Sequence, residues 1–361
     1  MLIKKEQVIK VIREKLKTGE FSPGSKLKSG IALAKEFNVS HITVRNALKE
    51  LSLSKELLVI HGKGIFVPNN KKQAKPNILV IRIGDNFESP SLYIMPEFIA
   101  KVSEKGGQVT EINIQFIRNN PSQKVISTLK NMAFTGILLD GASYIGNEPE
   151  IAIVKELNLP TIIVKADPND VNITGFDTLG CNIKQAWLDG LKAIIKTNKK
   201  RIALLLCDHK TKVFRNRTIE EHLTLLRKYG ADSDPELIQT CANLSEDNSN
   251  ENIAIAVDKL LSLKERPQAI YCFSDFIALK VYEILQSKNI RIPEDIGIMG
   301  FCGYPGGTLL DPPLATVDEN YATYGKVAAE KLCDTQYFNA EHKAQWIEIP
   351  YTVYTRKSIS K

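Results

Sequence analysis

The chain has 361 residues, of which 43% are hydrophobic and 25% charged, as is typical of folded globular proteins. This composition excludes a disordered chain and a coiled coil, and the length favours two or three domains. The longest apolar runs are far shorter than the ~20 residues of a membrane-spanning helix. The amphipathic N-terminus is unlike a signal peptide, so we expect a cytoplasmic protein.

Charge is unevenly distributed along the chain. The formal net charge is +7, yet residues 1–76 hold 16 Lys and Arg against 6 Glu, so the remainder carries −3. This asymmetry assigns any polyanionic partner to the N-terminal segment. The six cysteines form no C-x-x-C pair, so we expect no disulfide framework and no metal, and no motif calls for a cofactor.

Residues 1–68 are predicted to form three short helices and a hairpin. The first helix ends at Gly19, the second follows the cap residue Ser29, and the third runs from the cap residue Ser40 to about Leu53. A tri-helical unit with net positive charge is typical of a helix-turn-helix, whose third helix enters the major groove of DNA.

The hairpin follows directly as a wing. Two short β-type runs, 57–60 and 65–67, flank His61-Gly62-Lys63-Gly64, and the polar, proline-bounded residues 69–76 are predicted to be a linker. The wing glycines are also explained by a hairpin turn that needs a positive φ, whether or not DNA is present.

This segment resembles the DNA-binding domain of the GntR family almost end to end. The motifs that carry the resemblance are residues 19–27 (GEFSPGSKL), 33–40 (LAKEFNVS), 43–48 (TVRNAL) and 62–67 (GKGIFV). In that family the positions matching Arg45 and its helix neighbours contact operator bases, and the wing glycines let the backbone approach the minor groove. The resemblance therefore implies a DNA-binding site made of Lys4, Ser29, Ser40, His41, Thr43, Arg45, Asn46, Gly62, Lys63 and Gly64.

The residue chemistry agrees with that assignment. Arg45 can bond guanine O6 and N7 bidentately, and Ser40 and Thr43 can donate to phosphate from the helix start. Two departures stand out: Lys28-Ser29-Gly30 replaces the usual Pro-Ser-Glu, and His41 replaces a common Arg. For the lysines of this segment a solvated surface is as good an explanation as phosphate contact.

From residue 77 onward, strands alternate with amphipathic helices. The predicted helices include residues 179–197, 215–229 and 277–287, and the predicted strands are residues 78–83, 108–114, 136–140, 161–165, 201–207, 268–272 and 296–301. This βαβ repetition predicts a doubly wound parallel α/β fold in two lobes, with ligands beyond the carboxyl ends of the strands.

This second segment resembles the LacI-type effector domain, which shares its two-lobed fold with periplasmic sugar-binding proteins. The motifs are residues 177–180 (DTLG), 199–203 (KKRIA), 269–278 (AIYCFSDFIA), 292–301 (IPEDIGIMGF) and 312–317 (PPLATV). The combination of both domains is similar to the arabinose repressor subgroup. It implies an effector-binding and dimerisation domain over 77–361, with lobe 1 at about 77–170 and 320–340 and lobe 2 at about 171–318 and 341–361.

Effector residues carried over from this resemblance give a mixed picture. Arg215 matches the family arginine that clamps ligand hydroxyls, and Asp275 matches the acid of an Asn-Asp pair, whereas Ser274 and Cys302 replace a family Asn and Asp. We expect Arg215 and Asp275 to face the effector; an ion pair between lobes is the alternative for Arg215. The expected effector site comprises Asp85, Phe87, Asp140, Lys165, Arg215, Ser274, Asp275 and Cys302.

Some of these and neighbouring residues have plainer explanations. Phe87 and Trp187 are more often core residues than stacking platforms, and Asp177, Pro293 and 312–313 are more often turn or cap residues than ligand contacts.

The sequence thus predicts a homodimeric, sequence-specific transcription regulator, a repressor that binds pseudo-palindromic operator DNA under the control of a small polar metabolite such as a sugar. One alternative is a regulator whose sensor has lost its ligand. Another is a sugar-binding protein without DNA function. An α/β enzyme is disfavoured because no G-x-G-x-x-G, nucleophile elbow or paired His/carboxylate motif occurs.

Overall fold

The computed structural model describes residues 2–54, 56–60, 63–68, 75–84, 89–141, 143–207, 218–241, 249–339 and 341–360. The chain divides into two units, residues 1–74 and residues 75–361. Among the described residues, no helix is both long enough and apolar enough to cross a membrane.

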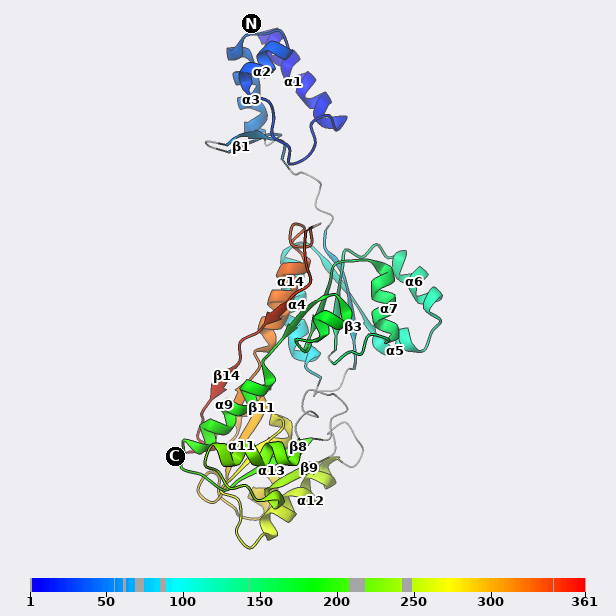
Figure 1. The fold of residues 1–361 in the computed structure, drawn as a ribbon. Coiled ribbons are helices and arrows are strands. Elements are labelled where there is room, and N and C mark those ends of the chain that lie inside the picture. The colour runs from blue at the N-terminus through cyan, green and yellow to red at the C-terminus, as the bar shows by residue number, and fades with distance from the viewer. Residues whose placement is uncertain are drawn as a thin grey trace. The chain divides into compact units, whose positions relative to one another are not determined.

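The first unit consists of three helices and a two-stranded antiparallel hairpin (Figure 1). Its elements are α1 (Leu2–Lys17), α2 (Gly30–Glu36), α3 (His41–Leu53), β1 (Leu58–Ile60) and β2 (Gly64–Phe66). The predicted caps are confirmed: Ser29 accepts a hydrogen bond from the Ala32 amide, and Ser40 accepts one from the Thr43 amide. Val8, Ile12 and Leu33 lie in a single buried core with the apolar face of α3.

The second unit contains two sheets of six strands, each flanked by helices. In the first lobe the strand order is β13-β7-β6-β5-β3-β4, and every pairing is parallel. These strands are β3 (Asn77–Arg82), β4 (Gln108–Asn113), β5 (Gly136–Asp140), β6 (Thr161–Val164), β7 (Asp177–Gly180) and β13 (Trp346–Glu348). The helices of this lobe are α4 (Ser91–Glu104), α5 (Ile114–Arg118), α6 (Ser122–Lys130), α7 (Pro149–Leu157), α8 (Asp170–Thr174) and α14 (Tyr321–Leu332).

In the second lobe the strand order is β14-β12-β11-β10-β8-β9, and only the pairing of β12 with β14 is antiparallel. These strands are β8 (Ile202–Cys207), β9 (Ile238–Cys241), β10 (Ala269–Cys272), β11 (Gly297–Cys302), β12 (Ala315–Asp318) and β14 (Thr352–Tyr354). The helices are α9 (Ile183–Ile195), α11 (Ile219–Lys228), α12 (Ser249–Ser262) and α13 (Asp275–Ser287), with single 3₁₀ turns η1 (Pro235–Leu237) and η2 (Gly307–Leu309).

One buried core is continuous across the two lobes. It joins α4 and α14, which lie side by side in Figure 1, to α9 and the strands of the second sheet. Trp187 stacks on Tyr271 within it at a ring-centroid distance of 3.9 Å, so the expectation that Trp187 is a core residue is confirmed. Each lobe buries a further apolar cluster on the other face of its sheet.

The predicted lobe boundaries were wrong at β7 and β13. Residues 177–180 were expected in the second lobe, with a helix beginning at residue 179, but they form a buried strand of the first lobe between β6 and β13. Asp177 is correspondingly neither a turn nor a cap residue: its carboxylate accepts from the Tyr337 hydroxyl at 2.6 Å and from the Gln345 amide at 3.0 Å. Polar residues in so short a strand hide the apolar pattern that marks buried strands.

Candidate functional site

Helix α3 exposes one face and buries the other. Val44, Ala47, Leu48 and Leu51 are buried in the core of the first unit, whereas His41, Arg45, Asn46, Lys49 and Glu50 are exposed. Among the described residues, no side-chain hydrogen bond or ion pair engages the exposed His41, Arg45, Asn46 or Lys49. These side chains are therefore available to a ligand outside the domain.

Thr43 lies on the inner side of this helix start. It is 7% exposed, and its hydroxyl is 2.8 Å from the Ser40 hydroxyl. The structure thus places Thr43 in the helix cap, whereas the expectation was a donor to phosphate. Ser40 itself is exposed, as is Ser29 at the start of α2.

The two departures from the family pattern lie against each other. A Cβ atom at Gly30 would lie 3.2 Å from His41 Nε2, so the imidazole occupies the space beside the start of α2. A longer side chain at position 30 would displace this ring. Sequence reasoning treated Gly30 and His41 as separate changes, but the structure couples them.

The wing is held against the preceding loop. Gly64 has a φ of +117°, and a Cβ atom there would lie 2.7 Å from Lys26 Cε. The hairpin explanation for this glycine is therefore supported by its backbone geometry. Lys63 is exposed at the hairpin turn, where its amide donates to the Ile60 carbonyl at 3.0 Å. Gly62 lies outside the described residues.

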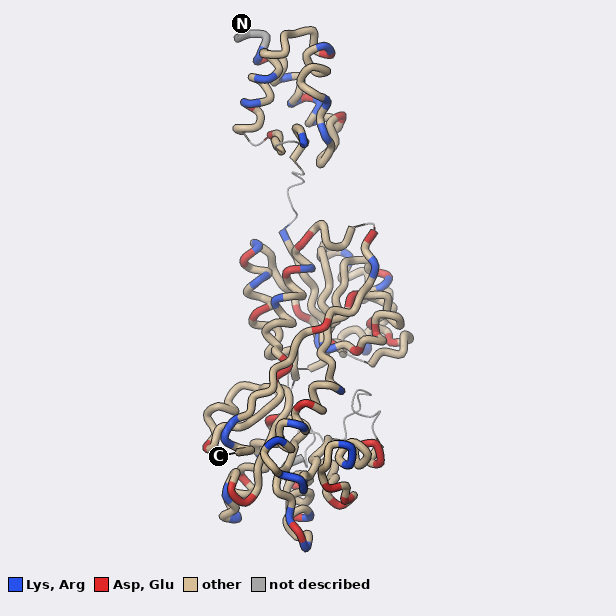
Figure 2. Tube along the Cα trace, turned by 60° about the vertical axis from the view of Figure 1, so that its left-hand side comes forward, with Lys and Arg blue, Asp and Glu red and all other residues tan. Residues whose placement is uncertain are grey.

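The positive charge of the first unit is partly internally paired. Lys5 pairs with Glu50 at 2.7 Å and Lys28 pairs with Glu36 at 2.8 Å. Figure 2 shows basic residues on all three helices, and the excess of cations over acids remains available for an anionic partner. Lys4 lies in α1, and its side chain is outside the described part.

In the second unit, part of the predicted effector site is brought together at the carboxyl ends of strands. Asp140 ends β5, Lys165 follows β6 and Cys302 ends β11, and all three interact electrostatically around Lys165. Lys165 forms a mostly buried ion pair with Glu319. Burial raises the pKa of Asp140, although the Ser91 hydroxyl and the Ile83 amide donate to its carboxylate.

Asp275 is engaged within its own lobe. Its side chain is buried; Oδ1 accepts from the Thr316 hydroxyl at 2.6 Å and Oδ2 from the Tyr304 amide at 2.7 Å. Burial raises the pKa of this carboxyl to about 7. Ser274 is the cap of α13, accepting from the Ile277 amide at 3.3 Å. These oxygens hold β12 and the loop after β11, and the expectation that Asp275 faces the effector stays a prediction.

Three predicted effector residues cannot be placed. Asp85, Phe87 and Arg215 lie outside the described residues, so the expectation that Arg215 faces the effector stays a prediction.

An aromatic cluster that the sequence analysis missed joins the two lobes at this edge. Tyr93 of α4 lies 4.9 Å from Tyr304 between ring centroids, and Tyr304 lies 4.5 Å from Phe276 and 5.6 Å from Tyr321. The Lys165 ammonium lies 5.0 Å from the centroid of the Tyr321 ring. The sequence does contain one indication of this cluster: Tyr304 and Tyr321 each follow the end of a strand by only a few residues.

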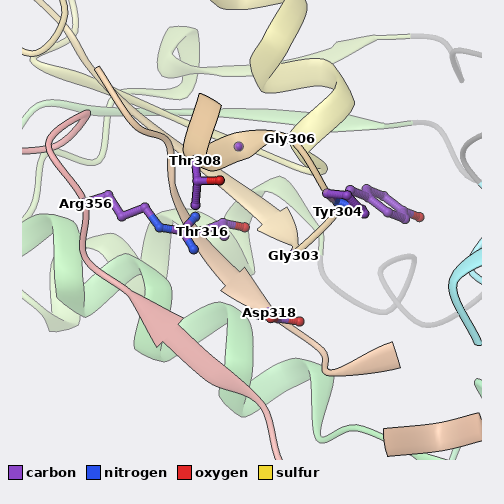
Figure 3. Close-up of a pocket in the computed structure, with 9 residues that line it drawn as sticks. Gly303, Tyr304, Gly306, Thr308, Thr316, Asp318 and Arg356 are labelled. Atoms are coloured by element: carbon purple, nitrogen blue, oxygen red, sulfur yellow. The ribbon is translucent and has the colours of Figure 1, made fainter. Parts of the chain in front are cut away.

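A small cavity of about 160 Å³ lies beside the loop after β11 (Figure 3). Its lining includes Thr308, Thr316, Asp318 and Arg356. The Arg356 guanidinium donates to the Leu314 carbonyl at 2.8 Å, and burial raises the pKa of Asp318. Within the described residues, no cluster of His, Cys, Asp and Glu could hold a metal ion.

Comparison with known proteins identifies both domains. Residues 4–67 match the gntR family of bacterial regulatory proteins, and residues 192–359 match the periplasmic binding protein-like domain.

Two relatives and one solved structure extend these matches. The HTH-type transcriptional repressor PurR of Aliivibrio fischeri (strain ATCC 700601 / ES114) is 27% identical over 57% of this chain, and the match spans only 59% of that relative's length. The arabinose metabolism transcriptional repressor of Geobacillus stearothermophilus is 21% identical over 87% of this chain and 86% of its own. The crystal structure of the transcription regulator GntR from Chromobacterium violaceum superposes with a TM-score of 0.62 at 20% identity, covering 78% of this chain and 98% of that one, and shows the shared fold. The chain thus carries a domain of the gntR family of bacterial regulatory proteins at residues 4–67 and joins it to a periplasmic binding protein-like domain.

Proposed function

We propose that the chain is a sequence-specific DNA-binding transcription regulator, a repressor, that works as a homodimer in the cytoplasm and responds to a small polar metabolite such as a sugar. The observation that carries the proposal is the exposed face of α3 in a domain of the gntR family, where His41, Arg45, Asn46 and Lys49 make no side-chain hydrogen bond or ion pair within the described part of the chain. The repressors among its relatives support the same function.

Reading of DNA is assigned to the start of α3 and to the wing. Arg45 and Asn46 offer donors suited to guanine and adenine edges in the major groove, and His41 lies one turn ahead of Arg45. The exposed Ser40 and Lys63 can reach phosphates, which position the domain without reading sequence. One short helix reads few base pairs, so useful specificity requires two half-sites and therefore two subunits.

Effector binding is assigned to the edge where the lobes meet. Asp140, Lys165 and Glu319 supply hydrogen-bonding charges there, and the tyrosines supply flat apolar faces that suit a sugar ring. A ligand controls DNA affinity only to the extent that it binds the DNA-competent and DNA-incompetent lobe arrangements unequally.

A regulator with a ligand-free sensor is a second candidate, because the polar and aromatic side chains at this edge already contact one another. Lys165 pairs with Glu319, the rings of Tyr93 and Tyr304 are in contact, and both oxygens of Asp275 accept hydrogen bonds. A sugar would have to replace these contacts before it could bind.

The DNA-binding function is tested by selecting binding sequences from random duplexes with the full chain. We expect a pseudo-palindrome, bound more tightly than an isolated half-site. Lys63→Ala should weaken binding to all sequences alike and reduce the salt slope by about one per half-site. Recovery of no preferred sequence would contradict the proposal and favour a sugar-binding protein without DNA function.

Effector binding is tested by thermal unfolding with a panel of pentoses, hexoses, sugar acids and sugar phosphates. A true effector at about 100 times its Kd should stabilise the chain by ~2.7 kcal/mol. It should also change the affinity for the selected operator. If no compound does either, while operator binding persists, the ligand-free regulator is the better description.

A further inference from the structure

Ile42 is an apolar side chain on the polar face of α3. It is 60% exposed, so the core of the first unit does not cover it. Ile42, Arg45, Asn46 and Lys49 follow the spacing i, i+3, i+4 and i+7, so they share one side of the helix. Solvent exposure is the least favourable setting for such a side chain, and the core of this unit gains nothing from it.

The neighbours of Ile42 distinguish it from an isolated surface apolar residue. Arg45 and Asn46, one turn along the same face, are exposed and make no side-chain hydrogen bond or ion pair among the described residues. His41 precedes it and lies beside Gly30 of α2, while Ile42 itself stays exposed. Ile42 is therefore the apolar element of a surface otherwise built to donate hydrogen bonds.

Only one base presents an apolar group in the major groove of B-DNA, namely thymine through its 5-methyl group. Residues at the N-terminal end of a recognition helix are those that reach the base edges. We propose that Ile42 recognises the 5-methyl group of a thymine in each half-site. This inference rests on the proposed DNA-binding function and adds a base preference to it.

The helix geometry restricts where this thymine lies. Three residues of α-helix advance ~4.5 Å, and successive base pairs are spaced ~3.4 Å along the DNA axis. The thymine read by Ile42 therefore lies within about two base pairs of the guanine that Arg45 reads. Lys49, a further turn along, extends the same face toward the phosphate backbone.

The test uses the full chain and operator duplexes obtained by selection, in which each thymine is replaced in turn by deoxyuridine. This replacement removes one methyl group and leaves every hydrogen-bonding atom unchanged. At one thymine per half-site we expect the affinity of the unmodified protein to fall about fourfold per half-site, which corresponds to ~0.8 kcal/mol. Ile42→Ala should bind the thymine and deoxyuridine duplexes equally well.

Leu53→Ala is the matched control, because Leu53 is 76% exposed at the other end of the same helix. It should discriminate thymine from deoxyuridine as the unmodified protein does. Both substitutions replace exposed side chains, so thermal unfolding should be unchanged.

The proposal is overturned if the unmodified protein ignores deoxyuridine at every position, or if Ile42→Ala still discriminates, even though a selected sequence is bound. Failure to select any sequence would instead overturn the proposed function, and this inference with it.

Discussion

Asp275 is buried, and ionisation of a buried carboxyl is unfavourable. Its contribution to the stability of the second lobe should therefore depend on pH. Its two oxygens accept from Thr316 and from the amide of Tyr304, which carries a ring of the aromatic cluster. Asp275→Asn keeps the size of the side chain and one acceptor, and it removes the ionisation. We expect the variant to be less sensitive to pH than the unmodified chain.

The sign and size of the effect follow from the pKa. The carboxyl titrates near its ordinary value of 3.8 in the unfolded chain and at about 7 in the folded chain. Between these pH values the folded chain holds more protons, so the free energy of unfolding falls as pH rises, and the loss is complete above about pH 7. The gap between the two pKa values corresponds to about 4 kcal/mol. This contribution is absent from Asp275→Asn.

Denaturant unfolding at several pH values from 5 to 8, followed by tryptophan fluorescence, measures the difference. Both tryptophans, Trp187 and Trp346, belong to the second unit, so the signal reports that unit alone. Asp275→Ala is the control: it leaves two buried donors without an acceptor and should destabilise the unit at every pH by about 1–3 kcal/mol per donor. If the free energy of unfolding fell equally with rising pH in the unmodified chain and in Asp275→Asn, the reasoning would be refuted.

Three further outcomes can be measured. Arg45→Ala should weaken operator binding by about 1–3 kcal/mol and broaden the preference at one base pair per half-site, which quantitative footprinting would detect; unchanged specificity would remove Arg45 from the base-reading surface. Ser40→Ala should remove the cap of α3 and cost about 1 kcal/mol, seen as faster amide exchange in that helix and not elsewhere. Gly180→Ala should destabilise the second unit by about 1–3 kcal/mol, seen as a lower unfolding midpoint, because its Cβ atom would lie 2.1 Å from the Trp346 ring and 2.2 Å from the Ala166 carbonyl oxygen; an unchanged midpoint would show that both neighbours can move aside.

Local signals in the sequence were sufficient to predict where the second and third helices of the first unit begin. Ser29 and Ser40 precede helices that begin where their side chains cap them, because a cap depends only on residues two or three positions away. The exposure of Ile42, by contrast, could not be predicted from the sequence. Periodicity identifies the apolar residues of a helix but does not say which of them the neighbouring helices cover.

In the second unit, local sequence patterns did not predict the contacts between segments that lie far apart in the chain. β7 contacts β13, Tyr337 and Gln345, which follow it by more than 150 residues. No residue close to Asp177 in the sequence indicates these contacts. Asp275 matched a motif, but its partners Thr316 and the Tyr304 amide come from other elements and occupy its oxygens. A motif identifies the residue, and only the fold determines its contacts.

The chain passes between the two lobes more than once, and this sets the order in which a ribosome can complete them. All strands of the first lobe except β13 are made by Gly180, but α14, which packs on α4, begins only at Tyr321. At ~5–20 residues per second this interval of about 140 residues takes roughly 7–30 s. During it α4 lacks its covering helix, while β8 to β12 of the second lobe are already synthesised. The lobe that is begun first thus waits for α14 and β13 until most of the second lobe has been made, and its uncovered apolar face exposes the nascent chain to aggregation and to chaperones.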